Sequence, residues 1–263
     1  MLGISASTGY PIPLEFRFPM LKKAGFDSII LGWDNSEMAT RVDRVWLAKA
    51  FDLKIEHAHA TYRDMNALWL PGTDGNRTAL RLLREIADCA EFGIETLVLH
   101  LTNGSTPPPV SAEGLNRIEY LVRLAEDSGV KLAFENVRVT EHLNAVLSYF
   151  TSPHIGLCFD SGHAHYWTPD SDLLDRYTDR VFAVHLHDNL ADGDTHLLPM
   201  DGSIDWQALM RKLAASGYAG SITLEADIHG SKAYEDAGLE AFLRKAHKRA
   251  ETLEEILQNF RTK

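Results

Sequence analysis

The chain has 263 residues, of which 45% are apolar and 24% charged, and its formal net charge at pH 7 is −11. This composition is typical of a globular protein, and the length suits one large α/β barrel or two small domains. The acidic charge disfavours broad binding to nucleic acid or to an anionic membrane surface, and no run of apolar residues is long enough to cross a bilayer.

Short apolar or β-branched runs alternate with longer helical patterns along the chain, which is typical of repeated βα units. The predicted strands are Leu2–Ser5, Ser28–Leu31, Lys54–His59, Glu95–His100, Lys131–Glu135, Ile155–Asp160, Val181–His187 and Ser221–Glu225. The clearest helical patterns are Ala79–Phe92, Leu115–Asp127, Trp206–Ser216 and Leu239–Phe260. Glycines follow several of these helices and precede strands, as left-handed helix caps do.

Eight strands with helical connections predict a single (β/α)₈ TIM barrel, of class α/β, over residues 1–263. No linker rich in proline, glycine or serine divides the chain, and Asn103–Pro109 is interpreted as a loop. A doubly wound sheet is the alternative architecture. It usually carries a glycine-rich phosphate loop after the first strand, and Ser5–Gly9 is not such a loop.

The ends of the predicted strands carry chemically capable side chains. In TIM barrels the active site lies at the C-terminal ends of the strands. Six successive strands finish on a metal-binding or proton-transferring group: His59, His100, Glu135, Asp160, His185 (or His187) and Glu225. Carboxylates and imidazoles together suit Zn²⁺, Mn²⁺ or Fe²⁺. A single one of them could be an isolated polar cap, but the set predicts a metal site, because unneutralised carboxylates at one mouth would repel one another.

Two local motifs add candidates. In Asp160-Ser-Gly-His163 the glycine permits a tight turn that brings His163 back beside Asp160. The i, i+2 spacing of Asp194 and His196 places both side chains on one face of an extended segment. Both motifs could instead anchor loops through hydrogen bonds. We interpret them as contacts to a metal or to the substrate.

Other candidates are weaker. His187 shares a strand face with His185 and could support the site without binding in it, and His57 shares a face with His59 one layer deeper, as core histidines do. Trp33 or Trp69 could provide an apolar wall for a ligand.

The start of the chain and its cysteines bear on location. The N-terminal residues have neither a basic segment nor a long apolar segment, so we expect no signal peptide. Two cysteines, Cys89 and Cys158, are too few for a disulfide framework, and Cys158 is interpreted as a packing residue. The expected location is cytoplasmic.

These residues resemble the xylose-isomerase-like TIM barrel superfamily, which includes sugar phosphate isomerases and epimerases and the endonuclease IV family. The resemblance is carried by Glu56–Tyr62, Leu97–His100, Phe134–Asn136, Gly156–His163, Val184–Asn189, Asp194–His196 and Thr223–Glu225. It implies a shared metal site formed by Glu135, Asp160, His185 and Glu225, of which the two glutamates also transfer protons in the isomerases and epimerases.

The endonuclease IV family adds further ligands and builds a three-zinc cluster. In this sequence the matching positions are His59, His100, His163, Asp194 and His196. Two departures from the superfamily stand out. Ketose epimerases usually place an arginine in the loop after the seventh strand, whereas this chain has no arginine between Arg180 and Arg211. The turn after His196 usually contains two glycines in this superfamily, and this chain keeps only Gly202.

The resemblance therefore implies a divalent-metal-dependent isomerase or epimerase of a sugar or sugar derivative, with Zn²⁺ or Mn²⁺, one ion or up to three. Glu135 and Glu225 would transfer a proton through an enediolate. The alternative is a zinc phosphodiesterase acting at abasic sites in DNA, for which Tyr62, Arg63 and Arg138 are the few candidate contacts. A non-catalytic binder is the third alternative. The expected partner is a small sugar, with nucleic acid disfavoured and no membrane; the long last helix could also meet a second subunit.

Overall fold

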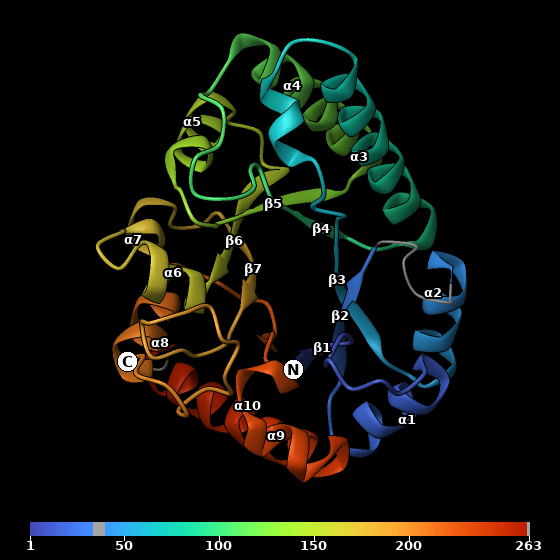
Figure 1. The fold of residues 1–263 in the computed structure, drawn as a ribbon, viewed down its shortest axis with the longest axis vertical. Helices are drawn as coiled ribbons and strands as arrows, with labels where there is room; N and C mark the ends of the chain where they lie inside the picture. The colour runs from blue at the N-terminus through green and yellow to red at the C-terminus, as the bar shows by residue number, and fades with distance from the viewer. Residues whose placement is uncertain (34–39, 262–263) are drawn as a thin grey trace.

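The protein is described by a computed structural model over residues 1–33 and 40–261. Eight parallel strands surround a central axis (Figure 1). They are β1 (Leu2–Ser5), β2 (Ser28–Gly32), β3 (Lys54–His59), β4 (Thr96–Leu99), β5 (Lys131–Glu135), β6 (Ile155–Asp160), β7 (Val181–His185) and β8 (Ile222–Leu224). From β1 to β7 each strand pairs with the next in sequence, and β8 pairs with β1.

The last seam of the barrel, between β7 and β8, is made by hydrogen bonds just beyond the end of β7. The amide of Leu186 donates to the carbonyl of Thr223 at 2.9 Å, and the amide of Glu225 donates to the carbonyl of Leu186 at 3.1 Å. Together with the eight-stranded order, this seam gives a nearly closed (β/α)₈ barrel, as the sequence predicts.

Helices form an outer ring around the strands (Figure 1). They are α1 (Leu14–Lys23), α2 (Arg41–Ala50), α3 (Thr73–Phe92), α4 (Ala112–Ser128), α5 (Glu141–Tyr149), α6 (Ser161–Trp167), α7 (Leu173–Arg176), α8 (Trp206–Ala215), α9 (Lys232–Ala237) and α10 (Leu239–Arg261), with the 3₁₀ turns η1 (Met65–Trp69) and η2 (Ile228–Gly230). The glycine caps are confirmed at Gly93 and Gly129, whose φ angles are both +72°. No helix of the described chain is long and apolar enough to cross a membrane.

The alternation of side chains along the strands positions the candidate site. The strand residues Val98, Ala133, Cys158 and Ala183 form a small, fully buried cluster separate from the main core between sheet and helices. Each lies two residues before a candidate site residue and therefore shares its face of the strand. The lumen is thus filled by small apolar side chains below a polar layer at the C-terminal ends of the strands.

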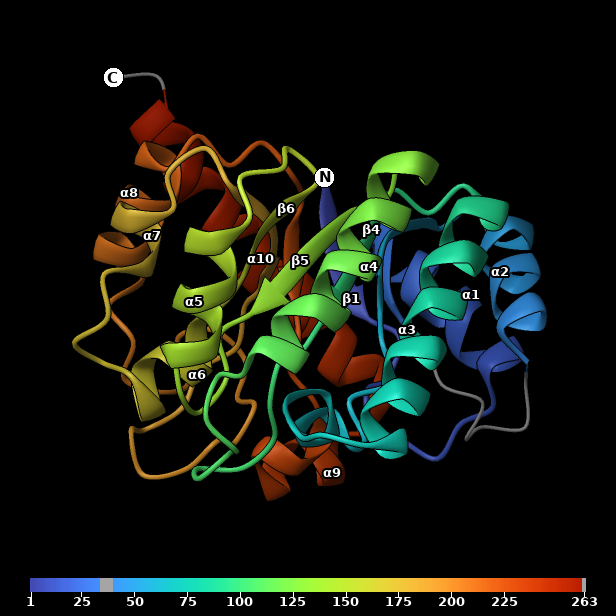
Figure 2. The ribbon, with the colours of Figure 1, turned by 90° about the horizontal axis from the view of Figure 1, so that it is seen from above.

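Figure 2 shows the barrel from the side. The arrowhead of β5 points towards the end of the barrel where η1 and α9 lie, and the N-terminus lies at the opposite end. The loops that follow the strands therefore gather at one mouth, which is the mouth that carries the candidate site.

Candidate active site

Glu135, the last residue of β5, lies at the centre of the polar layer. One oxygen, Oε2, lies 3.1 Å from Nε2 of His59 and 3.0 Å from Nε2 of His100. The other oxygen, Oε1, lies 3.4 Å from Nδ1 of His185 and 3.3 Å from Nδ1 of His163. The carboxylate is almost fully buried, with 1% of its side chain exposed. One glutamate thus connects side chains from the ends of β3, β4 and β7 and from helix α6.

Glu225 approaches the same imidazole from β8. Its Oε2 lies 3.1 Å from Nδ1 of His185. Glu135, Asp160, His185 and Glu225 each offer one nitrogen or oxygen atom, and these atoms all lie within 4.8 Å of one another. This is a spacing from which four groups can bind one cation. We call these four residues the central group.

A second group of possible ligands lies beside the central group. It consists of His163, His187, Asp194 and His196, whose ligand atoms also lie within 4.8 Å of one another. His163 Nε2 and His196 Nε2 each lie 3.5 Å from an oxygen of Asp194. We call these four residues the loop group, because all four lie beyond the ends of β6 and β7.

Three of these six imidazoles are oriented by a hydrogen bond from their second nitrogen. The Nδ1–H groups of His59, His163 and His196 donate to the carbonyls of Ala60, Asn136 and Glu225, at 2.9, 2.9 and 2.7 Å. Each of these bonds favours the tautomer that leaves Nε2 free to face the carboxylates. This is how metal-binding histidines are commonly held.

Charge pairing governs the pKa values of the central group. Burial alone would raise the pKa of Glu135, but the imidazoles of His185 and His100 outweigh it and hold that pKa well below its usual range. The pKa of Glu225 is also lowered, because His185 outweighs the effect of burial. Burial lowers the pKa of His185, but its contact with Cys158 and the carboxylates of Glu225 and Glu135 together raise that pKa well above its usual range. These directions favour ionised carboxylates at Glu135 and Glu225 and a protonated imidazole at His185.

The loop group shows the same pattern. Burial would lower the pKa of His196, yet its contact with Asp194 raises that pKa to about 10. His163 has a pKa well above its usual range because Asp160 and Asp194 outweigh its burial. These protons occupy the positions that a divalent cation would compete for.

Three buried atoms of these two groups form no hydrogen bond of suitable geometry among the described residues: Nδ1 of His185, Nδ1 of His187 and Oδ1 of Asp194. Nδ1 of His185 faces Glu225 and Oδ1 of Asp194 faces His196 only as ion-pair contacts, at 3.1 and 3.5 Å. Buried polar atoms normally have partners, and an ion is one explanation for an exception. Nitrogen and carboxylate donors of this kind fit Zn²⁺ or Mn²⁺. The residues present therefore fit a divalent cation.

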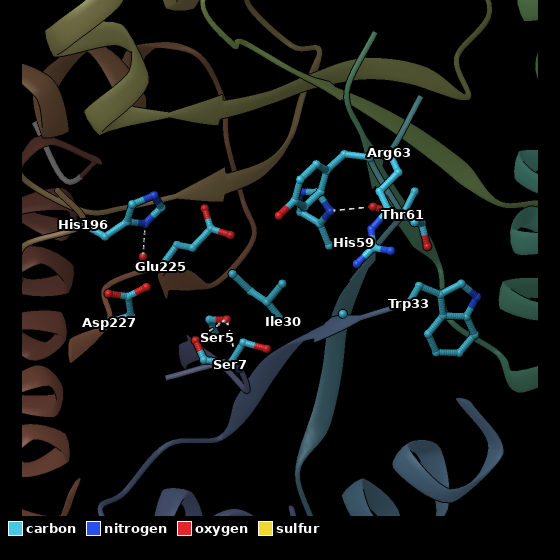
Figure 3. Close-up of a pocket in the computed structure, with 13 residues that line it drawn as sticks. Ser5, Ser7, Ile30, Trp33, His59, Thr61, Arg63, His196, Glu225 and Asp227 are labelled. Atoms are coloured by element: carbon cyan, nitrogen blue, oxygen red, sulfur yellow. Dashed lines mark hydrogen bonds between the residues drawn. The ribbon is translucent and has the colours of Figure 1, made fainter. Parts of the chain in front are cut away.

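Two cavities open onto these groups. The first, of about 460 Å³, lies at the ends of β1, β2, β3 and β8; Figure 3 shows Glu225 and His196 on one side of it and His59 and Arg63 on the other. The second, of about 390 Å³, is bounded by His100, Glu135, Arg138 and Trp167. Glu225 borders both cavities. Their volumes are those of small-molecule sites.

The residues predicted from the sequence come together in the fold. Glu135, Asp160, His185 and Glu225 form the central group, His59 and His100 contact Glu135, and the remaining three belong to the loop group: His163, Asp194 and His196. Their roles as ligands or catalysts stay predictions. Trp33 lines the first cavity, whereas Trp69 borders neither cavity and packs against His142, with ring centroids 4.6 Å apart.

Sequence reasoning undervalued two residues. His187 belongs to the loop group: its Nε2 lies 3.0 Å from Oδ1 of Asp160, and its ring stacks on His196 with centroids 3.9 Å apart. Strand alternation placed it on the correct face, but only the folded loop shows its contacts. The sequence does not indicate that Trp167 borders a cavity, because α6 is too short for its pattern to show which side faces the site. His57 lies one layer deeper, as predicted, with its Nε2 3.0 Å from that of His185.

The turn after His196 is built around a buried carboxylate. Asp188 accepts hydrogen bonds from the amides of Met200 and Ile204 and from the indole N–H of Trp206. A Cβ at Gly202 would collide with this carboxylate. The one glycine retained in this turn is therefore required by close packing, and the loop that carries Asp194 and His196 is held at its C-terminal end.

Comparisons with known proteins agree with the barrel fold. The sequence profile of the family described as "Xylose isomerase-like TIM barrel" matches residues 18–255. An inosose dehydratase of Clostridium beijerinckii is 30% identical over 139 residues, which cover 44% of this chain and 46% of that protein. The chain spans 45%, 62% and 46% of the first three curated relatives it matches.

Solved structures share the fold at low sequence identity. A D-tagatose 3-epimerase-like protein has a TM-score of 0.78 and 20% identity, and 98% of each chain is covered. A structure of the IOLI protein with a bound zinc atom has a TM-score of 0.72 and 18% identity, with 98% of each chain covered.

Proposed function

The chain belongs to the xylose isomerase-like TIM barrel family, and from that premise we propose that it is a divalent-metal-dependent isomerase or epimerase of a sugar or sugar derivative. Its site would remove and return a proton on the carbon next to a carbonyl group. One observation carries this proposal: two ionised glutamates, Glu135 and Glu225, flank the same imidazole nitrogen of His185 at 3.4 and 3.1 Å.

Proton transfer in both directions requires two groups. A carboxylate whose pKa is low accepts a proton only when it is brought close to an acidified C–H bond, and a second carboxylate can return the proton from another side. Glu225 borders both cavities and Glu135 borders the second. A sugar held between them would present one carbon to both side chains.

The central group would hold the cation: Glu135, Asp160, His185 and Glu225. When bound, the cation would supply Lewis-acid stabilisation of negative charge on the substrate oxygens. The imidazoles of His59 and His100, both in contact with Glu135, keep its carboxylate oriented. The relative that is an inosose dehydratase is consistent with this chemistry, because loss of water beside a carbonyl also begins with removal of a proton.

The second candidate function is a zinc phosphodiesterase. The loop group favours it, because a further set of three imidazoles and one carboxylate offers room for more than one cation. Against it, the chain has a formal charge of −11, which weakens the attraction of a DNA backbone. Metal analysis separates the candidates: about one equivalent favours the isomerase and about three favour the hydrolase.

Incorporation of solvent deuterium into a panel of ketoses, aldoses and inososes tests the proposed proton transfer. We expect exchange at the carbon next to the carbonyl, and we expect Glu135→Gln and Glu225→Gln each to slow it by about 10²- to 10⁴-fold while the protein remains folded. Glu240→Gln, on the exposed start of α10, is the matched control and should exchange like the unmodified protein.

Undiminished exchange in both glutamine variants would exclude them as the proton-transfer groups. Cleavage of an oligonucleotide containing an abasic site, without deuterium exchange into any sugar, would favour the hydrolase instead.

A further inference from the structure

Arg138 holds an unusual position at the rim of the second cavity. It lies three residues beyond Glu135, in the loop between β5 and α5. Its guanidinium carbon lies 4.8 Å from the ring centroid of Trp167. Trp167 in turn packs against the imidazole of His163, with centroids 4.7 Å apart. A guanidinium therefore lies over an aromatic face, in the lining of the cavity that also contains Glu135 and Glu225.

Stacking of this kind leaves the hydrogen-bond donors of an arginine available. The guanidinium of Arg138 lies over the indole ring, and an aromatic face accepts no conventional hydrogen bond from the N–H groups, which lie in the guanidinium plane. Among the described residues, no carboxylate lies within ion-pair distance of Arg138, although the chain is strongly acidic and most arginines around the barrel have such a partner or donate to backbone carbonyls. The Arg138 cation is held in place without being neutralised.

Arg63 offers a comparison. It also borders a cavity and also lacks a carboxylate partner among the described residues, and Figure 3 shows its guanidinium beside Thr61 and His59. Among the parts of the chain that the structure describes, no aromatic ring lies under the Arg63 guanidinium, so ordering this side chain on a ligand would cost more conformational entropy. Of the two arginines, Arg138 is the better pre-organised donor.

We propose that Arg138 binds an oxyanion carried by the substrate, and that the substrate is therefore an anionic sugar derivative, either a sugar acid or a sugar phosphate. This inference rests on the proposed function, since it adds a substrate class to the same site. The planar fork of a guanidinium matches two oxygens of a carboxylate or of a phosphate.

The placement also accounts for how an anion could enter so acidic a mouth. Glu135, Asp194 and Glu225 all border the second cavity and would repel a negative group placed near them. Arg138 lines the same cavity and offers the anion a cationic partner. A substrate anchored there would extend its uncharged carbons across the cavity of about 390 Å³ towards Glu135 and Glu225.

Calorimetric titration of the cation-loaded protein with three unreactive probes tests this proposal: sorbitol, gluconate and sorbitol 6-phosphate. We expect at least one of the charged probes to bind about tenfold or more tightly than sorbitol, because a charge-assisted hydrogen bond is worth that much. The charged probe that binds more tightly identifies the carboxylate or the phosphate as the anchored group.

Three variants assign the preference to a residue. Arg138→Gln should bind all three probes with similar affinity, and Arg138→Lys should keep only part of the preference because it retains the charge without the planar fork. Arg63→Gln is the matched control and should keep the preference. Arg138 is exposed, so these changes should leave thermal unfolding unaltered.

The proposal is overturned if the unmodified protein shows no preference for a charged probe, if Arg138→Gln keeps it, or if Arg63→Gln loses it instead. Binding is measured here without turnover. A failure of the proton-transfer scheme would appear in the deuterium experiment and would leave this titration unaffected.

Discussion

His187 connects the loop group, to which it belongs, with Asp160 of the central group. It contacts Asp160 at 3.0 Å, stacks on His196, and packs so closely on Gly162 that a Cβ there would collide with its ring. Nδ1 of this buried ring has no hydrogen-bond partner among the described residues. His187 can therefore act either as a ligand or as the group that orients Asp160.

Both roles predict the same result for the His187→Gln variant. Losing a ligand or a group that orients one typically weakens metal binding about 10- to 100-fold. Competition with a chromophoric zinc chelator would measure the change. His154→Gln is the control, because His154 lies before β6, at the opposite end of the barrel, and its Nδ1 bonds only to the carbonyl of Val130. Equal zinc affinity in the two variants would remove His187 from the metal centre.

For single residues, the sequence predicts the location of a side chain when that side chain follows a regular pattern. His59, Glu135 and Asp160 are the last residues of strands whose bounds were predicted correctly, so the known geometry of barrels places them at the mouth. His187 and Trp167 depend on the path of a loop and on the packing of one short helix. No periodicity encodes those features.

Among the connecting elements, the segment between β7 and α8 depends on close packing against Asp188. The Gly202→Ala variant would push a methyl group into that buried carboxylate and into the carbonyl of Asn189. We expect the free energy of unfolding to fall by about 1–3 kcal/mol, measured by urea denaturation. Gly193→Ala, in the same segment, meets only the methyl of Thr195 at 3.5 Å and should be nearly neutral. Equal stability of the two variants would contradict this account of the turn.

The same segment is tied to α10 through Asp201. Its carboxylate pairs with Lys245, accepts the hydroxyl of Tyr234, and lies 3.1 Å from a guanidinium nitrogen of Arg249. Burial would raise the pKa of Asp201, but the bonds from Lys245 and Tyr234 outweigh it and lower the pKa. A lowered pKa in the folded state means that the ionised form contributes stability above the unfolded-state value of about 3.9, and that this contribution disappears as the pH falls through the folded-state pKa.

Asp201→Asn should therefore lower the free energy of unfolding by about 1–2 kcal/mol at pH 7, with a difference from the unmodified protein that shrinks below about pH 4. Urea denaturation across this pH range measures the effect. Asp175→Asn, which breaks the exposed pair with Lys212, should change stability little at any pH. A pH-independent loss in Asp201→Asn would assign its effect to packing.

Element boundaries show where pattern reasoning ends. The sequence predicts β7 through His187 and β8 from Ser221, whereas the regular strands cover Val181–His185 and Ile222–Leu224. The apolar runs continue beyond the regular strands, into residues whose hydrogen bonds belong to the barrel seam or to loops. Strands predicted from composition alone are therefore too long. The short helices α6, α7 and α9 are stabilised by capping and tertiary contacts, and their sequences are too short to show a helical periodicity.

For the whole molecule, the number of strands and the alternation with helices were sufficient to predict the barrel, because few other arrangements bury eight parallel strands. Convergence of the acidic and imidazole side chains follows from that fold, since strand ends far apart in sequence meet at one mouth (Figure 1). That residues 1–263 form one domain, and that the protein is cytoplasmic, stay predictions. The anion-binding role proposed for Arg138 could not be predicted from the sequence, since only the fold brings Trp167 to it.

The central claim is that these side chains hold a divalent cation between two proton-transferring glutamates. Anomalous diffraction from crystals grown with Mn²⁺ or Zn²⁺, recorded at the absorption edge of the metal, tests it most directly. We predict an anomalous peak within ligand distance of Glu135, Asp160, His185 and Glu225. A crystal with the metal bound elsewhere and no peak among these four residues would contradict the claim.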